Sequence, residues 1–339
     1  MDEGVHRLRL EQIVISIYIY IYIEKKIVPK IKIRDISIKM IFYNNTVKSK
    51  VMESKLLFKL PTITTKIPST PVSDLVKKIK IHKKEIYNII EAFFKKKLPT
   101  SIYKDFSGLF WKSIKKEIPL QHLLLRLKDL YNKVDYSTKP TDNSRALSRV
   151  RNIKKWLNPL KRRKNLTYLD VGCSEASITG VVAQALGLKG GDIYGCDIYI
   201  EEIPESDVIF SRNTPTSLPY KDQEFALVTA FQALHHFSDP EKMLSEIHRV
   251  LQPKGVFIIR EHDVRNEAYG VYLDLIHALY MTVMGSEMTP EDFVAKYESF
   301  YHSKEQWSKR YIVPAGFRFA GIIKTNDRFN SYYARYYKI

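Results

Sequence analysis

The sequence predicts an α/β protein with a Rossmann-like, mostly parallel sheet that ends in an antiparallel hairpin, preceded by a basic, largely helical region with a short β segment. Three observations predict this class. From residue 166 onward, short apolar strands alternate with helical segments, as in a parallel sheet covered by helices. The segment LDVGCSEASITG (169–180) has the outline of a strand–turn–helix loop. Lysine and arginine are concentrated in the first half of the chain.

The first 60 residues are predicted to form a β-rich segment. Ile/Tyr alternation in IVISIYIYIYI (13–23) puts isoleucine on one face of a strand, and IKIRDISIKM (31–40) can pair with it. The first run is too short to span a bilayer as a helix, and no signal-peptide cleavage site follows it, so we expect no transmembrane segment. The run is either an interaction edge or one buried strand.

The remaining chain is predicted to form a linker and two further parts. PTITTKIPSTPV (61–72) is rich in Pro, Thr and Ser, which is typical of a linker. Residues 73–164 form a basic helical region, because apolar residues recur there every three or four positions with lysines between them. This region ends in the basic run KRRK (161–164), which can contact phosphates or simply be solvated. Residues 165–339 form the α/β domain.

The elements of the α/β domain follow from short apolar runs and helical periodicity. We expect parallel strands at 166–171, 193–197, 208–210, 225–230 and 255–260. We expect helices at 177–187, 240–251 and 267–284. The chain should close with a hairpin of strands 317–324 and 331–338 across the turn TNDRFN.

The loop after the first strand has the features of a nucleotide-type binding turn. Asp170 precedes the strand end, and Gly172 lets the chain turn without a Cβ. Ser174 and Ala176 stand where related loops carry glycine. Both are small, so close approach of a ligand remains possible if φ is negative there. Asp197 ends the next strand, where an acid can accept hydrogen bonds from ribose hydroxyls. A dinucleotide-binding dehydrogenase needs G-x-G-x-x-G, which is missing.

Residues 218–259 resemble the class I S-adenosylmethionine-dependent methyltransferases, in particular the group that includes the ubiquinone-biosynthesis enzymes. The resemblance is carried by the turn LPY, the strand FALVTA, the step ALHHF, the helix start at Asp239-Pro240 and the segment RVLQPKG. It extends over about 165–263 and, more loosely, to the C-terminal hairpin. Asp239 is a good N-cap and Pro240 suits the first helical turn.

The resemblance implies S-adenosylmethionine as cofactor and assigns its binding residues. Asp170 and Gly172, with Ser174 in the same loop, would lie near the methionine portion. The ribose would bind Asp197, the adenine would contact Ile198, and the sulfonium side would be lined by Phe231 and Gln232. Family members carry an acid for the adenine amino group where this chain has Thr214. A shift of one residue brings Asn213, whose side-chain oxygen can accept the same hydrogen bond.

The acceptor side is predicted to include REHD (260–263), which directly follows the fifth strand. Three of its members can accept a proton from an acceptor hydroxyl or amine: Glu261, His262 and Asp263. Alternatively, the cluster fixes the loop through ion pairs. One of His235 and His236 is expected only to pack, and His277 and Tyr280 line either the acceptor cleft or the core. The two cysteines have no spacing typical of a zinc site, so we expect no metal.

Charge and composition bound the function. Residues 1–164 contain 38 Lys and Arg against 14 Asp and Glu, whereas the rest contains 17 against 23. A module this positive attracts polyanions such as RNA, although a solvated lysine-rich surface explains it equally well. Two cysteines indicate a reducing, cytoplasmic location. The abundance of Tyr, Ile and Lys is typical of an A/T-rich genome, such as that of a large DNA virus.

The sequence therefore predicts a methyltransferase that acts on RNA at a base or cap nitrogen. The Lys–Asp–Lys–Glu set of ribose 2′-O methylation is not found, because Phe231 and Gln232 stand where its aspartate would follow the fourth strand. Two alternatives stay open. One is a small-molecule acceptor, and the other is a non-catalytic scaffold or nucleic-acid-binding protein that keeps the fold.

Overall fold

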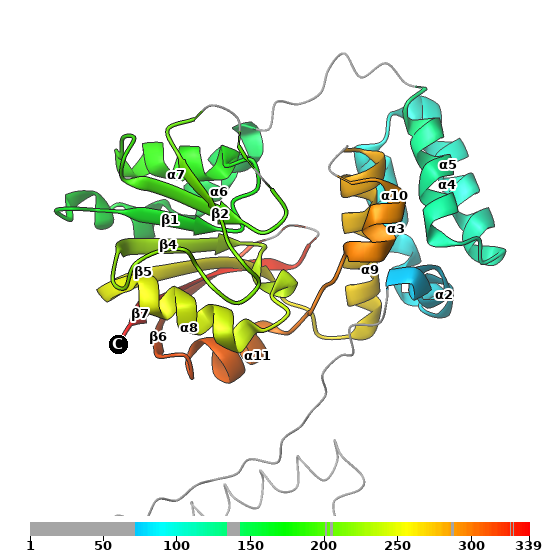
Figure 1. Cartoon of the computed structure of the whole chain (residues 1–339). Helices are drawn as coiled ribbons and strands as arrows, with labels where there is room; N and C mark the ends of the chain where they lie inside the picture. The colour runs from blue at the N-terminus through cyan, green and yellow to red at the C-terminus, as the bar shows by residue number, and fades with distance from the viewer. Residues whose placement is uncertain are drawn as a thin grey trace, which may run out of the picture. The chain divides into compact units, whose positions relative to one another are not determined.

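Within the residues that the structure describes, seven strands form one sheet in the computed structural model (Figure 1). They are β1 (Tyr168–Val171), β2 (Ile193–Asp197), β3 (Ile209–Arg212), β4 (Phe225–Phe231), β5 (Leu251–His262), β6 (Phe317–Lys324) and β7 (Ser331–Lys338). The strand order is β3-β2-β1-β4-β5-β7-β6. Strands β1 to β5 pair in parallel and β7 runs antiparallel between β5 and β6. The predicted fold class and the closing hairpin are confirmed.

Helices cover both faces of the sheet (Figure 1). One face packs against α6 (Asn143–Leu157) and α7 (Ser177–Leu186) through Ile153, Val182 and their neighbours. The other packs against α8 (Pro240–Val250) and the π-helix η6 (Trp307–Ile312), which directly follows α11 (Lys304–Gln306). The start of α8 is as predicted, because the Asp239 side chain accepts a hydrogen bond from the Lys242 backbone N–H. Strand β5 begins earlier than predicted, since Leu251 pairs with Phe225 before a register shift.

A separate helical core joins the N-terminal helices to helices that follow the fifth strand. It contains α2 (Leu75–Ile81), α3 (Lys83–Lys97), α4 (Thr100–Lys115), α5 (Leu120–Tyr131), α9 (Glu267–Ala278), η5 (Leu279–Val283) and α10 (Pro290–Lys296). Apolar side chains four residues apart, such as Ile102, Phe106 and Phe110, form the buried stripe of α4. Predicted helix 267–284 is thus α-helical in α9 and π-helical in η5.

The structure describes residues 72–133, 143–200, 202–203, 206–285, 288–325, 327 and 329–339, and all of them belong to one unit, Ile63–Ile339. The strands predicted at 13–23 and 31–40, and nearly all of the linker at 61–72, lie outside this part. The domain boundaries stay predictions, although α6 packs with the sheet and α2–α5 share a core with α9. No described helix is long and apolar enough to cross a membrane.

Candidate functional site

The loop after β1 turns through three residues with positive φ. Gly172 has φ 73°, Ser174 has φ 49° and Ala176 has φ 61°. Ser174 and Ala176 therefore lack the negative φ under which close approach of a ligand was expected. Both adopt the left-handed conformation that glycine favours, so neither residue supports a ligand site by itself. A Cβ at Gly172 would lie 2.6 Å from the Cβ of Ala233, so this position requires glycine. The conformation is held because the Ser174 N–H donates to Oδ2 of Asp197 at 3.0 Å.

Asp197 connects the ends of β1, β2 and β3. Its Oδ1 accepts a hydrogen bond from the Tyr199 N–H at 2.8 Å, and its backbone carbonyl accepts one from the Asn213 N–H at 3.3 Å. Ile198, next in the chain, is partly exposed beside it. The predicted ribose and adenine residues are therefore neighbours at the carboxyl ends of these strands.

Asn213 carries a buried acceptor with no partner. Asn213 is only 8% exposed. Its side-chain Nδ2 donates a hydrogen bond to the Thr214 carbonyl at 2.8 Å. Its Oδ1 has no hydrogen-bond partner. Thr214 is exposed and bridges to Ser217. Of the two candidates for the adenine amino group, Asn213 thus offers the unused oxygen.

Asp170 points into the protein. It is 2% exposed, and its carboxylate accepts hydrogen bonds from the hydroxyls of Thr179 at 2.7 Å and Thr229 at 2.6 Å. Burial raises the pKa of Asp170 to about 6, against the lowering effect of these two hydrogen bonds. Asp170 therefore anchors the loop to α7 and β4.

Gln232 lies between α6 and the end of β5. It has φ 60°, and its N–H donates to the Arg260 carbonyl at 2.6 Å. Its side-chain oxygen accepts from Arg149 Nη2 at 2.8 Å, and its Nε2 lies 3.0 Å from Nε2 of His262. Phe231 precedes it and is buried. Sequence reasoning missed Arg149, because nothing marks it among the other basic residues of its helix.

Glu261 and His262 belong to a buried histidine cluster. Nδ1 of His235 lies 2.7 Å from Oε1 of Glu261, which also accepts from the His262 N–H at 2.7 Å. Burial raises the pKa of Glu261 and lowers the pKa of His262 to about 4, so His262 is neutral near pH 7. The rings of His236 and His277 pack at 4.2 Å and 5.2 Å from the ring of His235.

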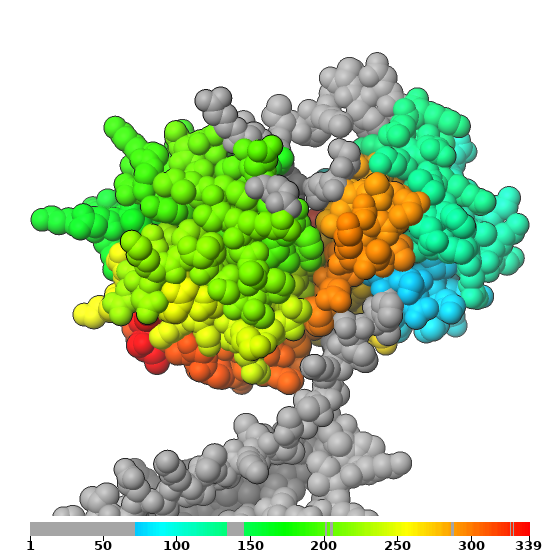
Figure 2. Space-filling view, viewed as in Figure 1, coloured from blue at the N-terminus to red at the C-terminus, as the bar shows by residue number. Residues whose placement is uncertain are grey.

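The segment that follows α10 packs against this cluster; the segment is part of the orange surface in the space-filling view (Figure 2). The Phe300 N–H donates to the His235 carbonyl at 2.6 Å, and the Tyr301 ring stacks on His235 at 5.3 Å. His277, the residue left open between cleft and core, joins the cluster. Tyr280 instead packs in the helical core against Phe93.

Asp263 is held in an ion-paired group. Its Oδ2 lies 2.8 Å from Lys304 Nζ and 2.9 Å from Arg265 Nη2. Burial alone would raise its pKa, but the hydrogen bonds from Arg265 and Lys304 lower it. Arg260 pairs with Asp327 at 2.8 Å. The structure thus brings Glu261 and His262 together with Gln232 and ties Asp263 to the Lys304 helix.

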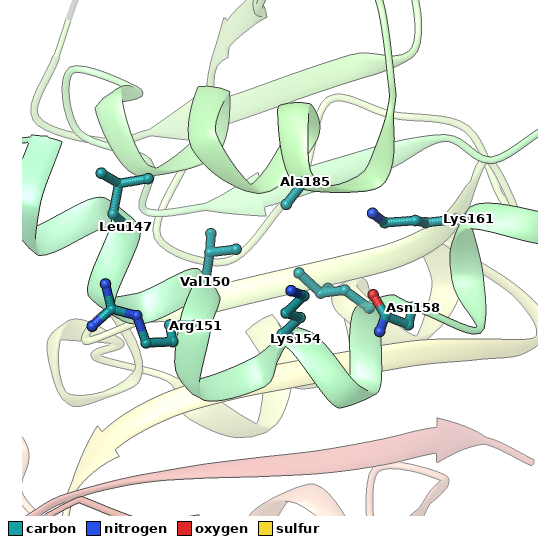
Figure 3. A pocket seen from close by; sticks show the side chains of 8 residues that line it. Leu147, Val150, Arg151, Lys154, Asn158, Lys161 and Ala185 are labelled. Carbon is teal, nitrogen blue, oxygen red and sulfur yellow. The ribbon is translucent and has the colours of Figure 1, made fainter.

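A basic groove of about 330 Å³ lies between α6 and α7 (Figure 3). Its lining combines apolar and basic side chains: Leu147, Val150, Arg151, Lys154, Leu157, Asn158, Lys161 and Ala185. None of the predicted cofactor residues lines it.

One part of the chain, which includes the loops at the strand ends, matches a known protein family. The family described as "Methyltransferase domain" matches residues 169–259, which run from β1 to β5. Residues 169–259 therefore match a methyltransferase domain. This match implies S-adenosylmethionine as the cofactor, as the resemblance in the sequence did.

The curated relatives match parts of the chain. An uncharacterised methyltransferase, YcgJ of Bacillus subtilis, is 38% identical over 64 residues, which are 19% of this chain and 25% of YcgJ. Norajmaline N-methyltransferase of Rauvolfia serpentina is 30% identical over 120 residues, 32% of this chain and 39% of that enzyme. The chain thus spans well under half the length of these relatives. The structure of PH0226 protein from Pyrococcus horikoshii is 20% identical, with a TM-score of 0.42, over 62% of this chain and 98% of that one.

The residues present in the methyltransferase domain fit this cofactor. The unpaired Oδ1 of Asn213 can accept from the adenine amino group. A Cβ at Gly172 would clash with the Cβ of Ala233, so the turn after β1 requires glycine at this position. The Asp197 carboxylate lies beside this turn, because it accepts a hydrogen bond from the Ser174 N–H. All three lie at the carboxyl ends of parallel strands, where ligands bind in open α/β sheets.

Proposed function

We propose that this protein transfers a methyl group from S-adenosylmethionine to a small-molecule acceptor bound beside the histidine cluster. The observation that carries the proposal is the convergence of Gly172, Asp197 and the unpaired Asn213 oxygen inside the segment that matches the methyltransferase domain. The enclosed acceptor side supports a small acceptor, because Glu261 and His235 are fully buried there. The names of the relatives, such as norajmaline N-methyltransferase, favour the same class.

When bound, S-adenosylmethionine would supply an electrophilic methyl group to the acceptor lone pair, with the electron pair of the methyl–sulfur bond left on the sulfur of S-adenosylhomocysteine. The acceptor proton passes to the buried pair Glu261 and His262, since a neutral imidazole can accept it. Gln232, fixed by Arg149, positions the sulfonium side. Most of the rate would come from this positioning.

Calorimetric titration of S-adenosylhomocysteine tests the cofactor site. We expect micromolar binding to the full chain, and Asp197→Ala to abolish it. Asp192→Ala is the matched control, because Asp192 is exposed and immediately precedes β2, at the end of the strand opposite Asp197. Methyl incorporation from labelled S-adenosylmethionine into small alkaloid, quinone and sterol acceptors then tests the substrate class. A folded protein that binds neither cofactor form would contradict the proposal.

An RNA acceptor is the second candidate, and two observations favour it. Residues 1–164 carry the excess of basic residues, and Arg151, Lys154 and Lys161 line the groove between α6 and α7. If the groove contacts phosphates, replacing Lys154 and Lys161 by alanine should lower the salt slope of RNA binding by about 0.7 per lost contact. Lys242→Ala on α8 is the control. A salt-independent affinity would exclude this candidate.

A further inference from the structure

We propose that His235, His262 and His277 bind a divalent transition-metal ion of the zinc class. One ring nitrogen of each residue lies within 4.8 Å of those of the other two. The three come from different elements: η4 (Leu234–His236), the end of β5 and α9. In a tetrahedral zinc site with Zn–N bonds of about 2.0–2.1 Å, the nitrogens are about 3.4 Å apart. Small side-chain movements would therefore complete the site.

The second ring nitrogen of each histidine is already held by an acceptor. Nδ1 of His235 meets the Glu261 carboxylate at 2.7 Å. Nδ1 of His262 meets the Phe329 carbonyl at 2.9 Å, and Nδ1 of His277 meets the Leu273 carbonyl at 2.9 Å. A carbonyl can only accept, so Nδ1 of His262 and of His277 carries the proton and Nε2 of each keeps its lone pair. Metal-binding histidines characteristically donate their other N–H to a carboxylate or carbonyl in this way.

A second, independent observation for a bound ion is the unpaired ring nitrogen of His235. It is 0% exposed, and its Nε2 has no hydrogen-bond partner. A buried polar atom without a partner costs free energy, and a metal ion would remove that cost. Nε2 of His262 lies 3.0 Å from Nε2 of the Gln232 amide and accepts a hydrogen bond from it. A bound ion would replace this contact.

The kind of ligand in the cluster determines which metal ion it can hold. Only neutral imidazole binds a metal. Three imidazoles match zinc-class ions, whereas magnesium and calcium prefer oxygen ligands. His277 is partly exposed, which gives the ion a side from which to enter.

Metal binding would change the role assigned to His262. An acceptor group coordinated to the ion loses its proton more readily, so His262 would act as a ligand and not as the base. This consequence rests on the proposed function, whereas metal binding itself does not.

The test measures metal directly on the full chain, freed of any polyhistidine tag. After treatment with a chelator, the protein is titrated with zinc and with cobalt, and retained metal is counted by mass spectrometry. We expect close to one ion per chain and the visible bands of four- or five-coordinate cobalt. His235→Ala and His277→Ala should abolish retention. Glu261→Gln, which removes an orienting carboxylate, should weaken affinity about 10- to 100-fold.

His122→Ala is the matched control, because His122 is exposed on α5 and outside the cluster. It should retain metal like the unaltered protein. X-ray absorption at the zinc edge counts imidazole ligands in the unaltered protein, so the assignment does not depend on any variant folding. Retention that survives both His235→Ala and His277→Ala, or no retention by the unaltered protein, would overturn the proposal. Calorimetry with S-adenosylhomocysteine on the same samples separates a failure of this site from a failure of the cofactor site.

Discussion

Asp170 couples the stability of the cofactor loop to pH. Its buried carboxylate has a pKa of about 6 in the folded protein against an ordinary value of 3.8. The folded state therefore holds the proton more tightly than the unfolded state. The contribution of Asp170 to stability is fully present below about pH 4 and is lost as pH rises through about 6. Asp170→Asn removes this dependence because the amide does not ionise.

The magnitude follows from the difference between the two pKa values. A difference of about two units, at 1.36 kcal/mol per unit, corresponds to roughly 3 kcal/mol of unfolding free energy. The amide also loses one of the two threonine hydrogen bonds, but that loss does not vary with pH. The unfolding free energy of Asp170→Asn minus that of the unaltered protein should therefore rise by roughly 3 kcal/mol between about pH 4 and about pH 7.

Urea unfolding followed by circular dichroism, repeated across this pH range, measures the difference. Asp274, whose pKa is also raised to about 6 by burial, titrates in both proteins and cancels. Asp192→Asn, an exposed carboxyl outside the loop, should run parallel to the unaltered protein. If Asp170→Asn also runs parallel, the carboxyl is not held at a raised pKa and the reasoning fails.

Three further predictions concern the cofactor pocket and the helical core. Asn213→Ala should weaken S-adenosylhomocysteine binding about 2- to 12-fold, the value of one neutral hydrogen bond, with little loss of stability, as calorimetry and urea unfolding can show. Arg149→Leu frees Gln232 and should weaken the same binding by about 10- to 100-fold, since a charged hydrogen bond is lost; unchanged affinity would exclude the role given to Arg149. Phe94→Ala, in the fully buried core shared by α3 and α4, should lower the unfolding free energy by about 3–5 kcal/mol. Ile81→Ser, at a side chain 75% exposed, should change it by less than about 0.5 kcal/mol.

The fold was predictable because its signals are local. Alternating strands and helices fixed the class, and Asp239 caps α8 as its position before Pro240 indicated. The start of β5 was not predictable, since it depends on the pairing of Leu251 with Phe225 on the neighbouring strand β4. The predicted boundary at position 164 depends on distant contacts in the same way, because residues before and after it share two hydrophobic cores. Periodicity identifies an apolar helix face but not the element that covers it.

The site was only partly predictable because its contacts join distant parts of the chain. Glu261 and His262 could be singled out next to a strand end, but His277 reaches them from a helix whose packing the sequence does not reveal. Lys304, 41 residues away, ties up Asp263. Arg149 is 83 residues from Gln232. In each case the decisive contact spans elements that share no local pattern.

The free energy stored in the cofactor loop distinguishes a binding site from a mere scaffold. Ser174 and Ala176 hold positive φ, at about 1–2 kcal/mol each, and the unpaired oxygen of Asn213 costs about 1–3 kcal/mol more. Such costs persist where the surrounding structure imposes them, and they concentrate at ligand sites. Replacing Asn213 by alanine removes the unpaired oxygen but also the hydrogen bond from Nδ2 to the Thr214 carbonyl, so stability should change little under either interpretation. A methyltransferase would lose cofactor affinity by the same change, whereas a scaffold has no such affinity to lose, so the binding measurement on Asn213→Ala decides between the two.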